Sequence, residues 1–202
     1  MCGIIGYVGH QQAAPILLDG LARMEYRGYD SAGVAVRSEA KGLQVRNKSK
    51  GRLQVLSDMI HGGADVEGTL GIGHTRWATH GEPNDINAHP HVSEDGRIAM
   101  VHNGIIENYM EIKQQLLRHG VKFKSETDTE VVAQLLEFHY RECHNMLEAV
   151  GRVLRRVEGS YALGIICADF PDRLLCARKD APLLLGFGKG ENFIASDVTA
   201  LV

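Results

Sequence analysis

The chain opens with MCGIIGYVG (residues 1–9), and residues 2–8 are apolar and punctuated by glycine, a pattern typical of a strand buried on both faces. Removal of Met1 would place a thiol and a free α-amine together on Cys2. Their reference pKa values are about 8.5 and roughly 7.7 to 8.0, so moving the proton from sulfur to nitrogen costs only about 1 kcal/mol. Such a residue is a nucleophile with its own base. From these nine residues alone, a small buried thiol at a strand end remains the simpler interpretation.

Length and composition indicate one ordinary globular domain. The chain has 202 residues, 44% hydrophobic and 23% charged, and its formal charge of -3 argues against nucleic acid as a partner. Four cysteines at positions 2, 143, 167 and 176 show no CxxC spacing, which favours reduced thiols. The N-terminus has no basic region, and no segment has the length and apolarity of a membrane span. We therefore expect a cytoplasmic protein with no membrane partner.

Hydrophobic periodicity predicts an α+β fold, with strands at both ends of the chain and helices between them. The expected helices cover 13–24, 53–60, 109–117, the segment that begins at Thr127, and 147–154. The expected strands cover 2–8, 34–36, 43–47, 69–75, 98–101, 161–167, 174–177, 183–187 and 193–195. Short connections favour antiparallel hairpins among the last four strands. No linker divides the chain, so residues 1–202 are read as one domain.

Capping spacings mark two of the central helices. Asn108 with Glu111, and Thr127 with Glu130, resemble capping boxes, which places Asp128 in a first helical turn. Between the expected strands lies a stretch from about residue 77 to 96 without apolar periodicity, rich in His, Asn, Pro and Gly. A loop of this length in a compact domain usually has a function.

Part of this loop has the composition of a ligand site. The run GHTRWATHGEP (73–83) contains two histidines, an arginine and the only tryptophan. Arg76 could bind a carboxylate through both arms of its guanidinium, although a surface ion pair is the plain alternative. The run NAHPH (87–91) lies nearby, yet none of these histidines has zinc-finger spacing and no HExxH occurs, so we assign no metal.

Two further segments offer polar groups that suit the same chemistry. In VHNGIIEN (101–108) a strand is expected to end at His102, followed by an amide side chain on Asn103 and the open backbone N–H of Gly104. Such a pair can stabilise an oxyanion, although Asn-Gly is also a common turn. Asp128 could hold a substrate ammonium or simply favour its helix N-terminus. A thiol with a base, an oxyanion donor pair, a cation and an anion together suit an amino-acid substrate.

Seven runs of sequence, in this order along the chain, resemble the glutaminase domain of the glucosamine-6-phosphate synthase family. They are CGIIGYVG, EYRGYDSAG, GHTRWATHGEP, NAHPH, VHNGIIEN, SETDTEV and ENFIASD. The resemblance extends from Cys2 to the C-terminus. It implies an N-terminal nucleophile hydrolase fold, which is a four-layer αββα sandwich with two mainly antiparallel sheets between helices.

The resemblance also implies a role for each matching residue and no cofactor. Cys2 would be the nucleophile with its α-amine as base, and Asn103 with Gly104 the oxyanion hole. The substrate-binding residues would be Arg76 for the glutamine carboxylate, Asp128 for its ammonium, Thr79 and His80 in the glutamine-binding loop, and Trp77 at the ammonia channel. Supporting positions would be Arg27, Asp30 and His89.

The implied reaction converts L-glutamine to glutamate and ammonia through a thioester on Cys2. In the parent enzyme, which the resemblance suggests is a homodimer, further domains use the ammonia to convert fructose 6-phosphate into glucosamine 6-phosphate. Those domains are not part of these 202 residues, so we expect a slightly truncated glutaminase domain and glutamine hydrolysis at most. The alternatives are the glutaminase domain of a purine-synthesis amidotransferase or a glutamine-binding module without turnover. The proposed base exists only if Met1 is removed.

Overall fold

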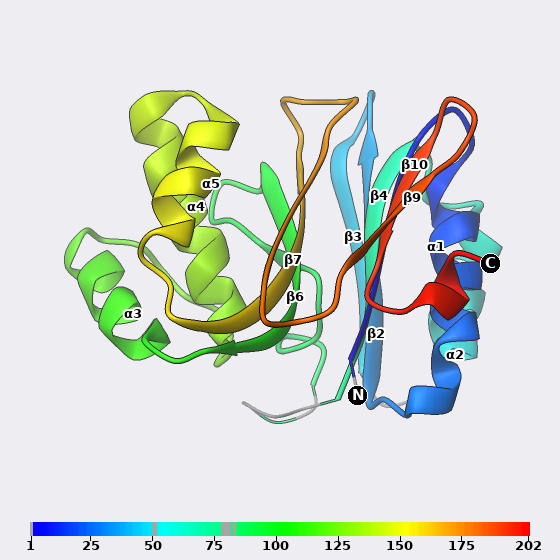
Figure 1. Ribbon diagram of the computed structural model, residues 1–202, viewed down its shortest axis with the longest axis horizontal. Helices are drawn as coiled ribbons and strands as arrows, with labels where there is room; N and C mark the ends of the chain where they lie inside the picture. The colour runs from blue at the N-terminus through cyan, green and yellow to red at the C-terminus, as the bar shows by residue number, and fades with distance from the viewer. Residues whose placement is uncertain (1, 50–51, 78–81, 83) are drawn as a thin grey trace.

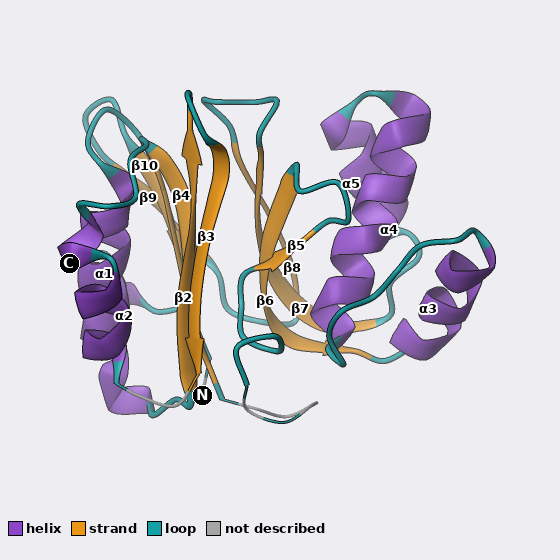
Figure 2. Cartoon of the chain, turned by 180° about the vertical axis from the view of Figure 1, so that it is seen from behind, coloured by secondary structure: helices purple, strands orange, loops and turns teal. Residues whose placement is uncertain are grey.

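Two β-sheets pack face to face, and a layer of helices covers the outer side of each (Figures 1 and 2). This computed structural model describes residues 2–49, 52–77, 82 and 84–202. From left to right in Figure 1, the four layers are helices, sheet, sheet and helices. The predicted αββα arrangement is therefore confirmed.

The first sheet has six strands and contains the N-terminal strand near its centre. Its order is β3 (Gly42–Ser49), β2 (Ser31–Ser38), β4 (Leu70–Arg76), β1 (Gly3–Val8), β10 (Asn192–Ala195) and β9 (Leu184–Phe187), and neighbouring strands are antiparallel. The helices α1 (Ala13–Arg23) and α2 (Leu53–Met59) cover its outer face (Figure 1). Strand β1 is buried on both faces as predicted, because α1 covers one face and the second sheet covers the other.

The second sheet has four strands in sequential order. These are β5 (His91–Val92), β6 (Ile98–Ile106), β7 (Gly159–Cys167) and β8 (Leu174–Lys179), again antiparallel. Its outer face packs against α3 (Tyr109–Arg118), α4 (Asp128–Cys143) and α5 (Met146–Leu154), which form the helical layer opposite α1 in Figure 1. Short 3-10 segments at Glu25–Arg27, His61–Gly63 and Val198–Ala200 complete the described elements.

Strand alternation divides the apolar residues among three cores. In β1, Ile4 faces the opposite sheet whereas Ile5 faces α1. In β6, Val101 faces between the sheets whereas Met100 faces the helices. Successive side chains of a strand point to opposite faces of the sheet. The positions of these residues therefore show which face each remaining side chain of β1 and β6 occupies.

Two predictions near the middle of the chain are wrong. The strand expected to stop at His102 continues to Ile106, because Gly104 pairs with Tyr161 of β7 at a φ of 116° instead of turning. Asn108 precedes α3 but makes no capping hydrogen bond. Its side chain instead donates to the Arg156 carbonyl at 2.8 Å and accepts from the backbone N–H of Glu158 at 3.0 Å. It therefore joins the start of α3 to the segment before β7.

The C-terminal strands form two hairpins that belong to different sheets. The β7–β8 and β9–β10 pairs are antiparallel as predicted. Between β8 and β9, however, the chain crosses from the four-stranded sheet to the six-stranded one, where β10 pairs with β1. Strand β2 begins at Ser31, earlier than expected, and the short β5 lies within the segment expected to be a loop.

Candidate active site

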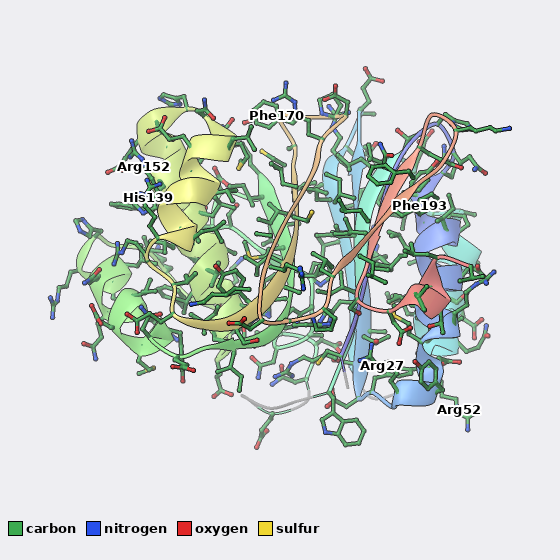
Figure 3. All side chains as sticks on the ribbon, viewed as in Figure 1. Arg27, Arg52, His139, Arg152, Phe170 and Phe193 are labelled. Atoms are coloured by element: carbon green, nitrogen blue, oxygen red, sulfur yellow. The ribbon has the colours of Figure 1, made fainter. Side chains whose placement is uncertain are left out.

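A pocket of about 690 Å³ opens at the end of the sandwich where β1 begins and β4 ends. Figure 3 shows Arg27 at this end, close to the start of the chain, whereas His139 and Arg152 lie on the distant helical layer. The pocket is lined by Cys2, Arg27, Arg76, Trp77, His89, His102, Asn103, Gly104, Ile105, Thr127, Asp128, Thr129, Ser160, Asp180, Ala181 and Pro182. Eight of the predicted site residues are among them.

Strand alternation brings several of these side chains together. Residues an even number of positions apart on a strand point to the same face of the sheet. The apolar side chains of Ile4, Ile72 and Val101 pack between the two sheets. Cys2, Arg76 and Asn103 lie an even number of positions from them, in the same order, and therefore point to the same side. Gly3 pairs with Thr75, so Cys2 lies opposite the end of β4. The inner faces of both sheets therefore end in polar groups at the same place.

The Cys2 thiol is held against the backbone of Trp77. The Trp77 N–H donates to Sγ at 3.3 Å, and the thiol donates to the Trp77 carbonyl at 3.6 Å. Burial raises the pKa of Cys2, while the Trp77 N–H and the positive charge of Arg76 act in the opposite direction. The resting thiol is thus protonated at neutral pH, and attack on an amide requires a base.

Asn103 reaches from the opposite sheet toward Cys2. Its Nδ2 donates to the Cys2 carbonyl at 3.3 Å, and its Oδ1 lies 2.9 Å from Nε2 of His74. At Gly104, which follows, a β-carbon would overlap the Ser160 carbonyl, so this close approach of β6 to β7 admits only glycine.

Asp128 occupies the first turn of α4 and is almost fully buried, with 7% of its surface exposed. One carboxylate oxygen accepts a hydrogen bond from the Ile106 N–H at 2.9 Å. Thr127 caps the helix by accepting from the Glu130 N–H at 3.2 Å, which confirms the predicted N-cap. The helix start therefore places a carboxylate in the pocket, where the helix dipole favours a negative charge.

Two arginines line the pocket, Arg76 from the six-stranded sheet and Arg27 from the 3-10 segment Glu25–Arg27. Arg76 is the last residue of β4 and is 4% exposed, and its carbonyl accepts from the Asp30 N–H at 2.8 Å. Arg27 forms an ion pair of 3.5 Å with Asp197, which follows β10. A second cation, Arg27, thus lies at the same end of the molecule as Arg76, while Asp30 contacts the β4 backbone.

His89 belongs to a buried histidine cluster, of which His89 and His102 line the pocket. Its Nε2 lies 2.8 Å from Thr129 Oγ1, and its ring stacks on His74 at 4.3 Å between centroids. His102 contacts the same Thr129 hydroxyl at 2.9 Å. Burial lowers the pKa of His89 and His102, so both rings are neutral at physiological pH. His102, Thr129 and Asp180 also line the pocket, although the sequence pattern indicated no role for them.

Of the remaining predicted residues, the structure describes Trp77. The Trp77 side chain is 54% exposed, although its backbone contacts Cys2. Thr79 and His80 lie outside the described residues. Over the described ranges, no group of three or more His, Cys, Asp or Glu side chains is arranged to hold a metal ion. In the same part of the chain, no helix is both long and apolar enough to cross a membrane.

Comparison with known proteins identifies the family. A sequence profile described as "Glutamine amidotransferase domain" matches residues 74–202. The chain belongs to the glutamine amidotransferase domain family. It is 58% identical over its whole length to a glutamine–fructose-6-phosphate aminotransferase (isomerizing) of Caldanaerobacter subterraneus and 54% identical to one of Thermus thermophilus. The chain covers 32% of each of these relatives, matching their N-terminal part.

Solved structures support the same assignment. The glutamine phosphoribosylpyrophosphate amidotransferase of B. subtilis superposes with a TM-score of 0.83 at 28% identity, covering 98% of this chain and 42% of that one. A class-II glutamine aminotransferase domain protein of Silicibacter pomeroyi has a TM-score of 0.65 at 16% identity and covers 96% of this chain and 88% of that one, which speaks to the fold alone. The glutamine amidotransferase domain therefore has the N-terminal nucleophile fold predicted by the resemblance.

Proposed function

We propose that this domain hydrolyses the side-chain amide of L-glutamine to glutamate and ammonia, with Cys2 as the nucleophile. The observation that supports the proposal best is the convergence of Cys2, Asn103 and Asp128 on one pocket from three different elements. The buried, protonated thiol needs a base close by, and the α-amine of Cys2, once Met1 is removed, is attached to the same Cα.

The reaction begins when the α-amine takes the thiol proton and the thiolate attacks the glutamine side-chain carbonyl carbon. Negative charge develops on the carbonyl oxygen, where Asn103 Nδ2 and the Gly104 N–H would donate hydrogen bonds. The ammonium of Cys2 then protonates the amide nitrogen, which leaves as ammonia as the tetrahedral intermediate collapses to a thioester. Water attacks the thioester, its oxygen joins the acyl carbon to give glutamate, and a proton returns to Sγ.

The ends of the substrate would be held by opposite charges. Arg76 would bind the α-carboxylate through two parallel hydrogen bonds, and Asp128 would bind the α-ammonium. Arg27, Asp30 and His89 would support this frame. Thr79 and His80 would contribute from the loop after Trp77, and the exposed Trp77 ring would shape the exit of ammonia.

The relatives suggest where the ammonia goes. We propose that the full-length protein converts fructose 6-phosphate into an amino sugar phosphate and that it works as a homodimer. The 50–58% identity to glutamine–fructose-6-phosphate aminotransferases favours this acceptor. The competing acceptor is that of the phosphoribosylpyrophosphate amidotransferases, whose fold agrees closely but whose identity is only 28%.

The test is glutamate release from L-glutamine by the purified chain, measured beside its intact mass. Processed protein should release glutamate, and Cys2→Ala should not. Protein that retains Met1 should be almost inactive, because its amine lies on another residue. A processed chain without turnover would leave the binding-module alternative, whereas full activity with Met1 in place would exclude the α-amine as base.

A further inference from the structure

His74 and Asn103 come from different sheets and meet between them. His74 lies on β4 with the parity of Ile72, and Asn103 lies on β6 with the parity of Val101, so both side chains enter the space between the sheets. The His74 Nε2 atom is 2.9 Å from Asn103 Oδ1 and 3.0 Å from the His102 carbonyl oxygen. A single ring nitrogen thus contacts both the side chain of Asn103 and the backbone just before it.

This geometry locates one proton and orients one amide. A backbone carbonyl only accepts hydrogen bonds, so His74 Nε2 must carry a proton and donate it. The amide atom of Asn103 that faces this N–H must then be the oxygen, since the NH₂ group would place two donors against each other. Nδ2 consequently points to the other side, where it lies 3.3 Å from the Cys2 carbonyl.

The surroundings of His74 keep the ring in this single form. His74 is fully buried, and burial lowers its pKa to about 3, so the ring stays neutral over the working range of pH. Its Nδ1 has no hydrogen-bond partner among the described residues, and its ring is stacked on His89. The His74 N–H is therefore a fixed donor, unsuited to shuttling protons.

We infer that His74 is a positioning residue for the oxyanion hole, because its Nε2–H holds the Asn103 amide with Nδ2 turned toward the reacting thiol. The inference rests on the proposed hydrolysis of glutamine and adds to it the reason why Asn103 presents a donor rather than an acceptor. If the Asn103 amide were free to rotate, it would present Oδ1 to the developing oxyanion for part of the time. The partial negative charge of Oδ1 would then repel the oxyanion. The rate of thioester formation therefore depends on a residue that never touches glutamine.

The first test compares kcat and KM in variants of the active, processed chain. His74→Met removes the donor while filling similar space, and His74→Gln keeps an N–H donor on a chain of similar reach. Loss of an oxyanion donor typically lowers kcat by about 10²- to 10³-fold, so we expect a misoriented donor to lower it by about 10- to 10²-fold in His74→Met. KM should stay within about threefold of the wild-type value, and His74→Gln should recover most of kcat.

Repeating the substitution in an Asn103→Ala variant tests whether His74 acts through the Asn103 amide or through the overall structure of the site. With no amide left to orient, adding His74→Met should lower kcat no further. His139→Met, on the distant helical layer in Figure 3, controls for replacing an imidazole by a thioether. An equal fall in kcat in both backgrounds, or an unchanged kcat in folded His74→Met, overturns the inference. An inactive processed wild type would instead refute the proposed function itself.

A second readout does not depend on activity. Nitrogen-15 NMR of histidine-labelled wild-type protein should show His74 as the neutral Nε2–H tautomer from pH 5.5 to 8.5. A ring protonated on Nδ1, or one that becomes charged in this range, contradicts the assigned hydrogen bond and overturns the inference. This measurement also decides the matter if His74→Met does not fold.

Discussion

The Asp128 carboxylate accepts a hydrogen bond from the Ile106 N–H at 2.9 Å, which joins the first turn of α4 to the last residue of β6. The group proposed to bind the substrate ammonium is thereby held in register with the strand that carries Asn103. Asp128→Asn keeps an acceptor for Ile106 but removes the charge. We expect KM for glutamine to rise about 10- to 10²-fold, because a hydrogen bond to a charged group contributes about 1.5 to 3 kcal/mol. Steady-state glutamate release measures this change.

An analogue without the α-amine provides the control for Asp128→Asn. Wild-type protein should use 4-carbamoylbutanoate much less efficiently than glutamine, and the variant should discriminate far less between the two. The free energy of unfolding should change by less than about 1 kcal/mol, since the contact with Ile106 is retained. An unchanged KM for glutamine in the variant would show that the ammonium binds elsewhere.

Gly104 should tolerate no side chain. It combines a φ of 116° with a backbone so close to Ser160 that a β-carbon overlaps the carbonyl oxygen. We expect Gly104→Ala to lower the free energy of unfolding by at least about 3 kcal/mol, because strain and overlap add. Gly96 is the matched control, since its φ is also positive at 76° but the space around it is open. Gly96→Ala should cost only about 1 kcal/mol in urea unfolding, and equal losses in the two variants would contradict the role of the Ser160 contact.

Elements with a clear hydrophobic period could be predicted from the sequence, because the spacing of apolar residues within the element itself distinguishes a helix from a strand. Helix α1 and strand β1 are of this kind. The continuation of β6 through Asn103 could not be predicted, since an Asn-Gly pair reads as a turn until its partner strand β7 is known. The same reason explains Asn108, whose side chain bonds to a segment about fifty residues away.

The residues of the candidate site also differ in how far they could be predicted from the sequence. Cys2, Arg76 and Asp128 could be proposed from their own chemistry, and the family resemblance then favoured these roles over the plain alternatives. His74 was visible only as one of several histidines in a polar run. Its partners lie on the opposite sheet, and contacts between two sheets depend on how the sheets are stacked. The parity of His74 with Ile72 was the available signal, because it predicts a polar side chain on an apolar, inward face.

The buried histidines should make the fold sensitive to acid. Burial lowers the folded-state pKa to about 3 for His74 and about 4 for His91, below the value near 6.5 expected in the unfolded chain. The unfolded state therefore binds more protons as pH falls, so this stability is fully present above about pH 6.5. It is lost as pH falls toward the folded pKa, which is about 4 for His91 and about 3 for His74. At pH 5 each of these histidines should lower the free energy of unfolding by about 2 kcal/mol relative to pH 7.5.

Urea unfolding at both pH values checks this prediction. His91→Met removes one of the two groups and should reduce the loss between pH 7.5 and 5 by about 2 kcal/mol. His10→Met, at an exposed position, controls for the removal of an imidazole. If His91→Met unfolds with the same pH dependence as the wild type, His91 is not buried in its neutral form.

Two N-caps of similar geometry separate stability from substrate binding. Thr127 accepts from the Glu130 N–H at 3.2 Å at the start of α4, and Asn145 accepts from the Glu148 N–H at 3.1 Å at the start of α5. Asn145→Ala should lower the free energy of unfolding by about 1 kcal/mol. Thr127→Ala should lower it further, because the Thr127 hydroxyl also contacts His91 Nε2 at 2.9 Å. Only Thr127→Ala should also raise KM for glutamine, by about 3- to 10-fold, because the next residue is Asp128 and a shifted first turn moves its carboxylate. An equal rise in KM for Asn145→Ala would mean that loss of stability, and not the position of Asp128, controls binding.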